Sequence, residues 1–427
     1  MPETQTPVVA ALLVTATRAV WPAKAERTSA VLAARPSSIA GQRLFAGTAF
    51  VVGLVAGFCV LAMFGFLDVW EKGIFGNDFS LIWAGPYLFI SGANPYDPQV
   101  WQRAIVDLGV QATSTRVFIY PGWVPLFLAP FGAMDLPHAA GLWLALTLIA
   151  GAVGLWALLD ARIRHLPLAH TLFAFAFVAS EPAIVTFYSG QWDFLLVGGL
   201  ALTALWMTKR PALAAVAASV MLFKPQLFFI AVPSVFRIAL ARGVPRFVTT
   251  FLGVSAFWSI ASTLAFASWW IAYLTVPTTQ AGDIRAATLP NGLRDTFGDA
   301  GLYAGVTLVL LLVALGFAYS PRARAAIAVW LAISLSAAPY AFVYDHMLGL
   351  VPLAMATGVI GDRNPTRALM LAALGVAILF AGSITLHAYP GVEHGTLSFN
   401  GIAQFSLAAL VVGALWPYRR TPEFTGW

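Results

Sequence analysis

Apolar runs of about twenty residues recur along the whole chain, with polar segments between them. A helical run of this length matches the hydrocarbon thickness of a bilayer. Of the 427 residues, 60% are hydrophobic and only 10% are charged, whereas a soluble protein carries about a quarter charged residues. We therefore predict an all-α, polytopic transmembrane helical bundle. A transmembrane β-barrel would instead show alternating segments of about ten residues.

About twelve runs can be counted as spans. They cover 44–67, 117–134, 139–159, 169–188, 194–207, 212–236, 247–266, 302–319, 325–341, 347–360, 368–386 and 402–416. Lys224-Pro225 interrupts one of them. An alternative is that 117–134 and 211–236 are broken or re-entrant elements and about ten segments cross, because backbone breaks are tolerated where they line a cavity. We expect about ten to twelve membrane segments.

Basic residues set the expected orientation. Five of them precede the first run, whereas Asp68 and Glu71 follow it. Since Lys and Arg favour cytoplasmic loops, we expect a multi-pass protein of the plasma (inner) membrane with its N-terminus inside. The expected parts are a disordered cytoplasmic tail (1–43), a membrane domain (44–417) with outer loops at 68–120 and 267–300, and a second cytoplasmic tail (418–427).

Two further compositional features narrow the function. The net charge of +6 fits basic cytoplasmic loops and membrane lipid, and we expect no nucleic-acid partner. Cys59 is the only cysteine, so neither an intramolecular disulfide nor a cysteine metal cluster can form.

The first outer loop carries the first candidate for chemistry. Residues 79–90 have aromatic residues at helical spacing, and both this segment and 99–108 are predicted interfacial helices. Asp78 has two interpretations, an N-cap of the first helix or a general base at the mouth of an outward cavity. Asp97 follows Pro95 in a turn, and we expect it to bind the local backbone.

Lys224 lies deep inside an apolar run, next to a proline. A charged group at such depth is costly and by default faces a cavity or a partner. The alternative is that its side chain snorkels to the interface. In a polar cavity, the ammonium would suit an anionic ligand such as a lipid phosphate.

Two short polar segments interrupt the apolar sequence. Gln191 and Asp193 lie in a short turn, either as a solvated loop or as part of a protein-lined site. Tyr344, Asp345 and His346 lie at a helix end expected on the same outer side as Asp78, where a histidine can exchange a proton.

Other outer-loop residues are candidates of a weaker kind. Four basic residues could bind a phosphate or a sugar, and the alternative for each is that it is solvated. They are Arg285, Arg294, His387 and His394. The following aromatic residues either stack on a sugar or anchor the chain at the interface: Tyr87, Tyr96, Tyr120 and Trp123.

Several common motifs are absent from the sequence. It contains no P-loop, no dinucleotide fingerprint, no HExxH and no GxSxG. This absence favours a lipid-borne substrate, and we expect no cofactor. Asn77 and Asp78 alone do not make a convincing metal site, since hard cations prefer several oxygen ligands.

The motifs occur in a characteristic order. They are Asn77-Asp78-Phe79, the turn at 92–97, Tyr120-Pro121, Ala129-Pro130-Phe131, Gly190-Gln191-x-Asp193, Lys224-Pro225 and Tyr344-Asp345-His346. In these motifs the chain resembles the GT-C glycosyltransferases of glycosyltransferase family 87, which include bacterial α-1,2-mannosyltransferases. The resemblance runs from about residue 44 to 417. Gly122 and Asp193 depart from it, standing where proline and asparagine are common.

The resemblance implies a hexosyltransferase with a polyprenyl-phosphate sugar as donor and a lipid or glycan as acceptor. Mannose is the first candidate sugar, and the anomeric configuration is expected to invert. The acidic residue of the family's first outer loop maps onto Asp78 as general base. His346 is the second catalytic candidate. The expected substrate contacts are Asn77, Tyr87, Tyr96, Tyr120, Gln191, Asp193, Lys224, Arg294, Tyr344 and Asp345.

Two rival interpretations remain open at this point. A transporter or flippase for a lipid-linked sugar would use Lys224 and Asp78 only for binding. Two matching halves with broken helices would favour it, and the sequence has one clear break. A structural subunit of an envelope complex would leave the buried lysine unexplained.

Overall fold

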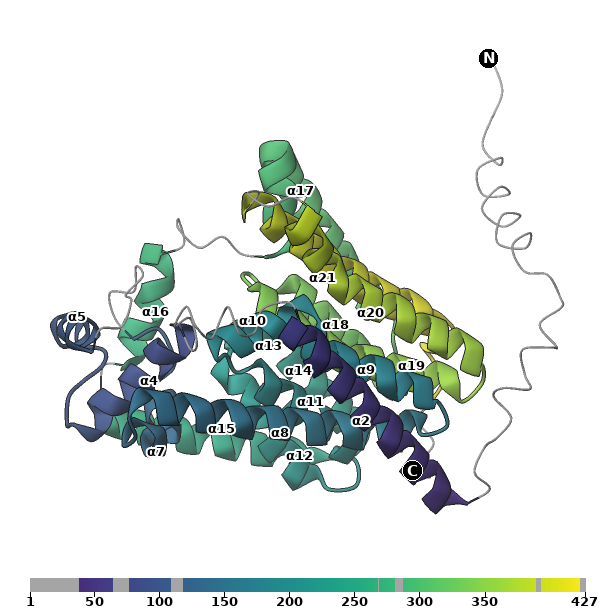
Figure 1. Ribbon diagram of the computed structural model, residues 1–427, viewed down its shortest axis with the longest axis horizontal. Helices are drawn as coiled ribbons and strands as arrows, with labels where there is room; N and C mark the ends of the chain where they lie inside the picture. The colour runs from purple at the N-terminus through teal and green to yellow at the C-terminus, as the bar shows by residue number, and fades with distance from the viewer. Residues whose placement is uncertain are drawn as a thin grey trace, which may run out of the picture. The chain divides into compact units, whose positions relative to one another are not determined.

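The computed structural model describes residues 38–63, 77–108, 118–267, 269–280, 287–388 and 393–422, and their regular elements are helices (Figure 1). Within these ranges, the only extended pairing is an isolated bridge between Ala323 and Pro422. The predicted all-α polytopic bundle is confirmed. Of the expected tails, residues 1–37 and 423–427 lie outside the described residues.

The described residues divide into two units between Phe45 and Ala46. In the first unit, Ser38 precedes helix α2 (Ile39–Met63), and its Oγ accepts a hydrogen bond from the Gly41 N–H at 3.0 Å. This is the capping contact preferred at a helix N-terminus.

Six helical segments of the described residues are long and apolar enough to cross a membrane. They are α2, α8 (Leu136–Ile163), α15 (Pro245–Ala265), α17 (Leu289–Gly316), the pair η2 (Val343–Gly349) and α19 (Leu350–Gly361), and the C-terminal part of α21 (Glu393–Leu415) with η3 (Trp416–Tyr418). A seventh span is possible if α9 (Pro167–Ala179) and α10 (Glu181–Ser189), bent by 43°, are counted as one.

Five shorter apolar segments complete the set. They are α11 (Asp193–Trp206), α12 (Pro211–Ala218) with η1 (Ser219–Phe223), α14 (Ala231–Ala241), α18 (Ala326–Ala337) and the part of α20 (Pro365–Ala388) up to Ala381. The expected number of about ten to twelve segments is therefore reached only when these shorter helices are included.

The two runs that the alternative count treated as broken are indeed broken, as is the run at 169–188 between α9 and α10. Residues 117–134 hold only α6 (Trp123–Phe127) and α7 (Ala129–Gly132). In the run at 212–236, Lys224 leaves the helical region (φ −133°, ψ 65°) and Pro225 begins α13 (Pro225–Phe228). The break follows from proline, which lacks an N–H and disfavours a helical residue before it. The alternative with two broken elements is thus the correct one for the backbone.

The segment 267–300 is largely helical. It holds α16 (Trp269–Gln280), and α17 begins at Leu289, well before the predicted run at 302–319. Gly298 interrupts α17 with φ 63° and ψ −151°. The two helices predicted for residues 79–90 and 99–108 are present as α4 (Asn77–Ile90) and α5 (Pro98–Asp107).

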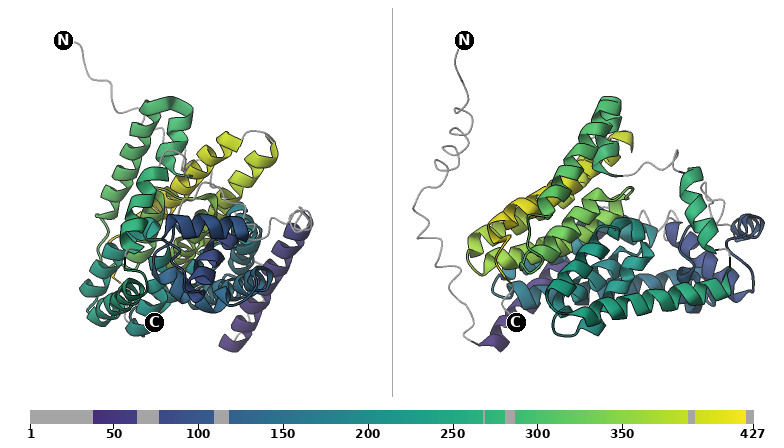
Figure 2. Two further views of the ribbon diagram at one scale, coloured as in Figure 1. Left: turned by 90° about the vertical axis from the view of Figure 1, so that its left-hand side faces the viewer. Right: turned by 180° about the vertical axis from the view of Figure 1, so that it is seen from behind.

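Buried helices form the centre of the second unit. Side chains all round α19 are buried, and α18 is buried from Ala326 to Ser336. A helix that is apolar on every face is stable only when other helices surround it, and α19 packs against α8, α18, α20 and α21. Beside them α17 and α21 lie next to each other (Figure 2).

Glycine allows a close helix contact that bears on the site. In α8, a Cβ on Gly154 would lie 2.6 Å from the Cα of Gly198 in α11. Small residues of this kind let two membrane helices approach closely. The contact fixes α11, whose first residue is Asp193, against α8.

Candidate active site

Helix α4 is anchored at two points that fix Asp78. The Trp83 indole donates hydrogen bonds to the carbonyl oxygens of Phe131 and Met134, both at 3.1 Å. Phe79 stacks on Trp143 of α8, with ring centroids 6.0 Å apart. Asp78 lies in the first turn of α4, and its Oδ2 accepts a hydrogen bond from Gln191 Nε2 at 2.8 Å. The carboxylate therefore binds a partner 113 residues away.

The turn between α10 and α11 presents Gln191 and Asp193. Gly190 takes a left-handed conformation (φ 67°), which glycine adopts without the usual steric cost. Its carbonyl oxygen accepts from the Trp143 indole at 2.9 Å, and the Gln191 N–H donates to the Thr186 carbonyl at 3.2 Å. Both polar side chains are buried and surrounded by protein, so the solvated loop is wrong.

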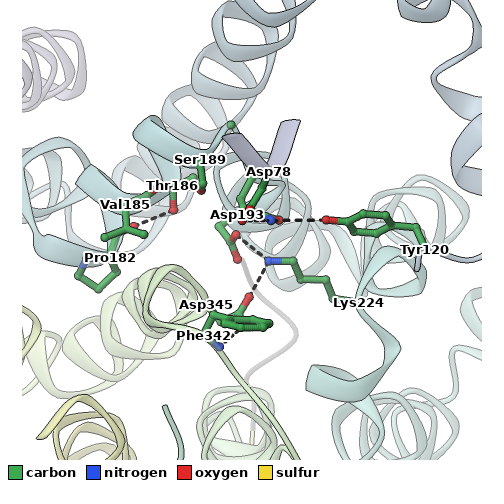
Figure 3. A network of polar contacts seen from close by, with 12 residues as sticks. Asp78, Tyr120, Pro182, Val185, Thr186, Ser189, Asp193, Lys224, Phe342 and Asp345 are labelled. Atoms are coloured by element: carbon green, nitrogen blue, oxygen red, sulfur yellow. Dashed lines mark hydrogen bonds and ion pairs between the residues drawn. The ribbon is translucent and has the colours of Figure 1, made fainter. Parts of the chain in front are cut away.

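Lys224 lies between two carboxylates. Its Nζ donates to Asp193 Oδ2 at 2.8 Å and to Asp345 Oδ1 at 2.6 Å, and these contacts converge on one point (Figure 3). The ammonium also lies over the Tyr344 ring, 4.3 Å from its centroid. Only 5% of the lysine side chain is exposed. Snorkelling is therefore wrong for Lys224, because its charge is satisfied inside the bundle.

Asp345 ties this lysine to the backbone of η2. Its second oxygen, Oδ2, accepts from the Phe342 N–H at 2.7 Å. Both carboxylate oxygens of Asp345 are thus engaged, whereas Asp193 Oδ1 is buried without a hydrogen-bond partner among the described residues. Asp193 therefore keeps one carboxylate oxygen that Lys224 does not contact.

Tyr120 lies beside Gln191. Its hydroxyl lies 3.5 Å from Gln191 Nε2, and its backbone carbonyl accepts from the Tyr96 hydroxyl at 2.8 Å. Tyr96 therefore supports Tyr120 from outside the cluster. We call Asp78, Tyr120, Gln191, Asp193, Lys224, Tyr344 and Asp345 the central cluster.

The central cluster holds three carboxyl groups and one ammonium group. Burial raises the pKa of Asp78 above its ordinary value, and the nearby Asp345 carboxylate adds to this. The Gln191 hydrogen bond and the Lys224 charge oppose the increase. Burial and the Asp78 charge likewise raise the pKa of Tyr120. A carboxylate with a raised pKa is a stronger base than an exposed one.

Other predicted residues lie outside the central cluster. A ring nitrogen of His346, Nε2, is 3.0 Å from the Ala287 carbonyl. Tyr87 stacks on Trp83 at 5.1 Å and lines a cavity of about 310 Å³ between α4 and α5. Arg294 has 57% of its side chain exposed and lies 3.7 Å from Asp299. Asp97 caps α5 by accepting from Gln99 and Val100, as predicted.

The side chains of Asn77, Arg285, His387 and His394 lie outside the described part of the chain. Trp123 donates its indole N–H to the Leu222 carbonyl at 3.2 Å, just before the Lys224 break. It therefore braces the backbone near the central cluster.

One buried acid was missed from the sequence. Glu181 stands at the bend between α9 and α10 and is only 5% exposed, and its Oε1 accepts from Asn400 Nδ2 at 3.4 Å. The signal was available, because an ionisable residue inside the apolar run at 169–188 is itself a candidate for function.

Comparison with known proteins identifies the family. The sequence matches the profile of glycosyltransferase family 87 over residues 118–357, more than half of the chain. No curated protein and no solved structure has significant similarity to it. The match includes every residue of the central cluster except Asp78, and it is shorter than the resemblance expected over 44–417. The chain therefore belongs to glycosyltransferase family 87 and is a multi-pass membrane glycosyltransferase, acting on a sugar donor and an acceptor.

Proposed function

We propose that the protein transfers a hexose from a polyprenyl-phosphate donor to a hydroxyl of a lipid or glycan acceptor, at the outer face of the plasma membrane. Mannose is the first sugar to test. Asp78 is the general base, and the anomeric configuration inverts. The observation that carries this proposal is the hydrogen bond between Asp78 and Gln191. It places the Asp78 carboxylate beside the central cluster residues that lie within the family match.

The proposed reaction balances as a single displacement. The acceptor oxygen forms a bond to the anomeric carbon while its proton passes to the Asp78 carboxylate. The bond between the anomeric carbon and the donor phosphate oxygen breaks, and its electron pair stays on that oxygen. The products are the glycoside, polyprenyl phosphate and a protonated Asp78, which then loses its proton to solvent. A positioned base typically contributes about 10²–10⁴-fold to such a rate.

Charge develops on the departing phosphate, so a nearby donor of hydrogen bonds is needed. Lys224 directs two of its three N–H groups at carboxylates. In this proposal its remaining N–H contacts the phosphate, and His346 is the second phosphate contact or acid–base group. The rings of Tyr120 and Tyr344 flank the sugar. A lipid-borne donor also gives a reason for an enzyme that is mostly membrane helix.

A transfer assay tests the proposal. Purified protein in nanodiscs is given a panel of radiolabelled polyprenyl-phosphate sugars and a membrane lipid extract as acceptor. We expect one donor to yield a labelled glycoside, and NMR of that product to show inversion. Retention of configuration would contradict direct displacement by the acceptor.

The same preparation separates the transferase from the rival transporter. Donor lipid is placed in one leaflet of proteoliposomes, with and without acceptor. Label that crosses the bilayer without new glycoside would favour the transporter. Family membership and the burial of Lys224 between two carboxylates favour the transferase.

A further inference from the structure

The side-chain amide of Gln191 contacts the proposed base, Asp78. The residue is 3% exposed, and its Nε2 lies 2.8 Å from Asp78 Oδ2 and 3.5 Å from the Tyr120 hydroxyl. An amide nitrogen has two N–H donors, so one group can serve both oxygens. Gln191 was expected to contact substrate, but its donors point to protein groups.

The backbone around Gln191 leaves this amide little freedom. Left-handed Gly190 ends α10, its carbonyl is held by Trp143, and the Gln191 N–H is held by Thr186. Two residues later Asp193 reaches Lys224. The short turn therefore aims one side chain at the base and another at the lysine.

We propose that Gln191 is a positioning residue, whose side-chain amide orients the Asp78 carboxylate towards the acceptor hydroxyl and favours its ionised form. This rests on the proposed function, in which Asp78 is the base. The chemistry supports the assigned orientation, since an ionised carboxylate only accepts hydrogen bonds and must be faced by the nitrogen. The amide oxygen Oε1 is buried without a hydrogen-bond partner among the described residues.

Other ionisable groups face Asp78 and set the background for this effect. They come from α10, the segment before α6, α11, the Lys224 break and η2, and they are Tyr188, Tyr120, Asp193, Lys224, Tyr344 and Asp345. Of these only Lys224 carries a positive charge. Without the Gln191 amide, Asp78 would be left with mainly acidic neighbours.

The pH profile of kcat/KM tests the inference. In Gln191→Leu, which keeps the bulk and removes the donor, we expect the acid limb to move to higher pH by about one to two pH units, the range for losing one hydrogen bond to a charged group. In Gln191→Glu the limb moves further, because a second carboxylate repels the first. At high pH both variants recover part of the lost rate. Gln404→Leu is the matched control, a buried glutamine in α21, and its limb stays in place.

Infrared titration provides a readout without turnover. The carbonyl band that disappears in Asp78→Asn reports protonation of Asp78, and in Gln191→Leu this band should persist to higher pH. If the limb and the band stay unchanged in folded Gln191→Leu while Asp78→Asn is inactive, the positioning role is wrong and the base assignment stands. If Asp78→Asn keeps its activity, the base assignment itself is wrong and the positioning role falls with it.

Discussion

At the scale of single residues, the central cluster is defined by an imbalance of charge. Asp78, Asp193 and Asp345 share one ammonium group, that of Lys224. Buried charges are tolerated only when they are paired and hydrogen-bonded. An arrangement with surplus carboxyl groups is therefore costly to the fold, and such costs are typical of functional sites.

The first prediction at this scale concerns the stability of Asp78→Asn. Burial raises the pKa of Asp78 in the folded protein, so ionisation of this group weakens the fold as pH rises above the ordinary aspartate pKa of about 4. We expect the variant to have a Tm at pH 8 equal to or above that of the wild type, and the difference to vanish below about pH 4. Scanning calorimetry in detergent checks this. A clearly lower Tm at pH 8 would mean that the carboxylate stabilises the fold.

The second prediction concerns the stability of a Lys224 variant. In Lys224→Met two buried carboxylates lose their shared partner, and we expect a loss of about 3–5 kcal/mol in the free energy of unfolding. Adding Asp193→Asn and Asp345→Asn should restore part of this. Lys209→Met, at an exposed lysine, is the control and should change little. Unfolding in detergent measures all of them, and an unchanged Lys224→Met would contradict the ion-pair assignment.

At the scale of elements, breaks in helices put polar groups into an apolar interior. Pro225 and Gly190 each lie beside a cluster residue, and both residue types are visible in the sequence. Proline and glycine could therefore locate the breaks. They could not pair Gln191 with Asp78 or Lys224 with Asp345, because these pairs are 113 and 121 residues apart and depend on tertiary packing.

A prediction at this scale uses two glycines of α8. Gly154→Ala puts a Cβ 2.6 Å from Gly198 Cα, so α8 and α11 must separate and Asp193 must move. We expect a lower Tm and a large loss of transfer. At Gly141 a Cβ meets nothing within 4 Å, so Gly141→Ala should leave activity intact and stabilise the helix by about 0.5–1 kcal/mol. Equal effects of the two substitutions would contradict the close contact.

At the scale of the whole molecule, composition was enough to predict the membrane bundle. Recurrent apolar runs gave the all-α class, and ordered motifs gave the family that the profile match then supported. The number of crossing helices was harder to predict. Length and composition alone do not separate a helix such as α18, buried in the protein, from one that faces lipid.

The orientation in the membrane is the prediction at this scale. Cys59 is the only native cysteine, so Cys59→Ser gives a background for single-cysteine labelling in intact cells. We expect Asp97→Cys to react with an impermeant maleimide and Arg322→Cys to react only after lysis, because basic residues favour the cytoplasmic side. The reverse pattern would place the proposed site inside.

The most direct test of the central claim is the single-turnover transfer rate of Asp78→Asn beside Asp97→Asn. Both substitutions remove one carboxylate from the segment between α2 and α6, and asparagine is as good a helix cap as aspartate at position 97. If Asp78 is the base, its variant loses about 10²-fold or more while remaining folded, and Asp97→Asn stays close to the wild type. Equal rates in the two variants would show that the proton is taken by another group.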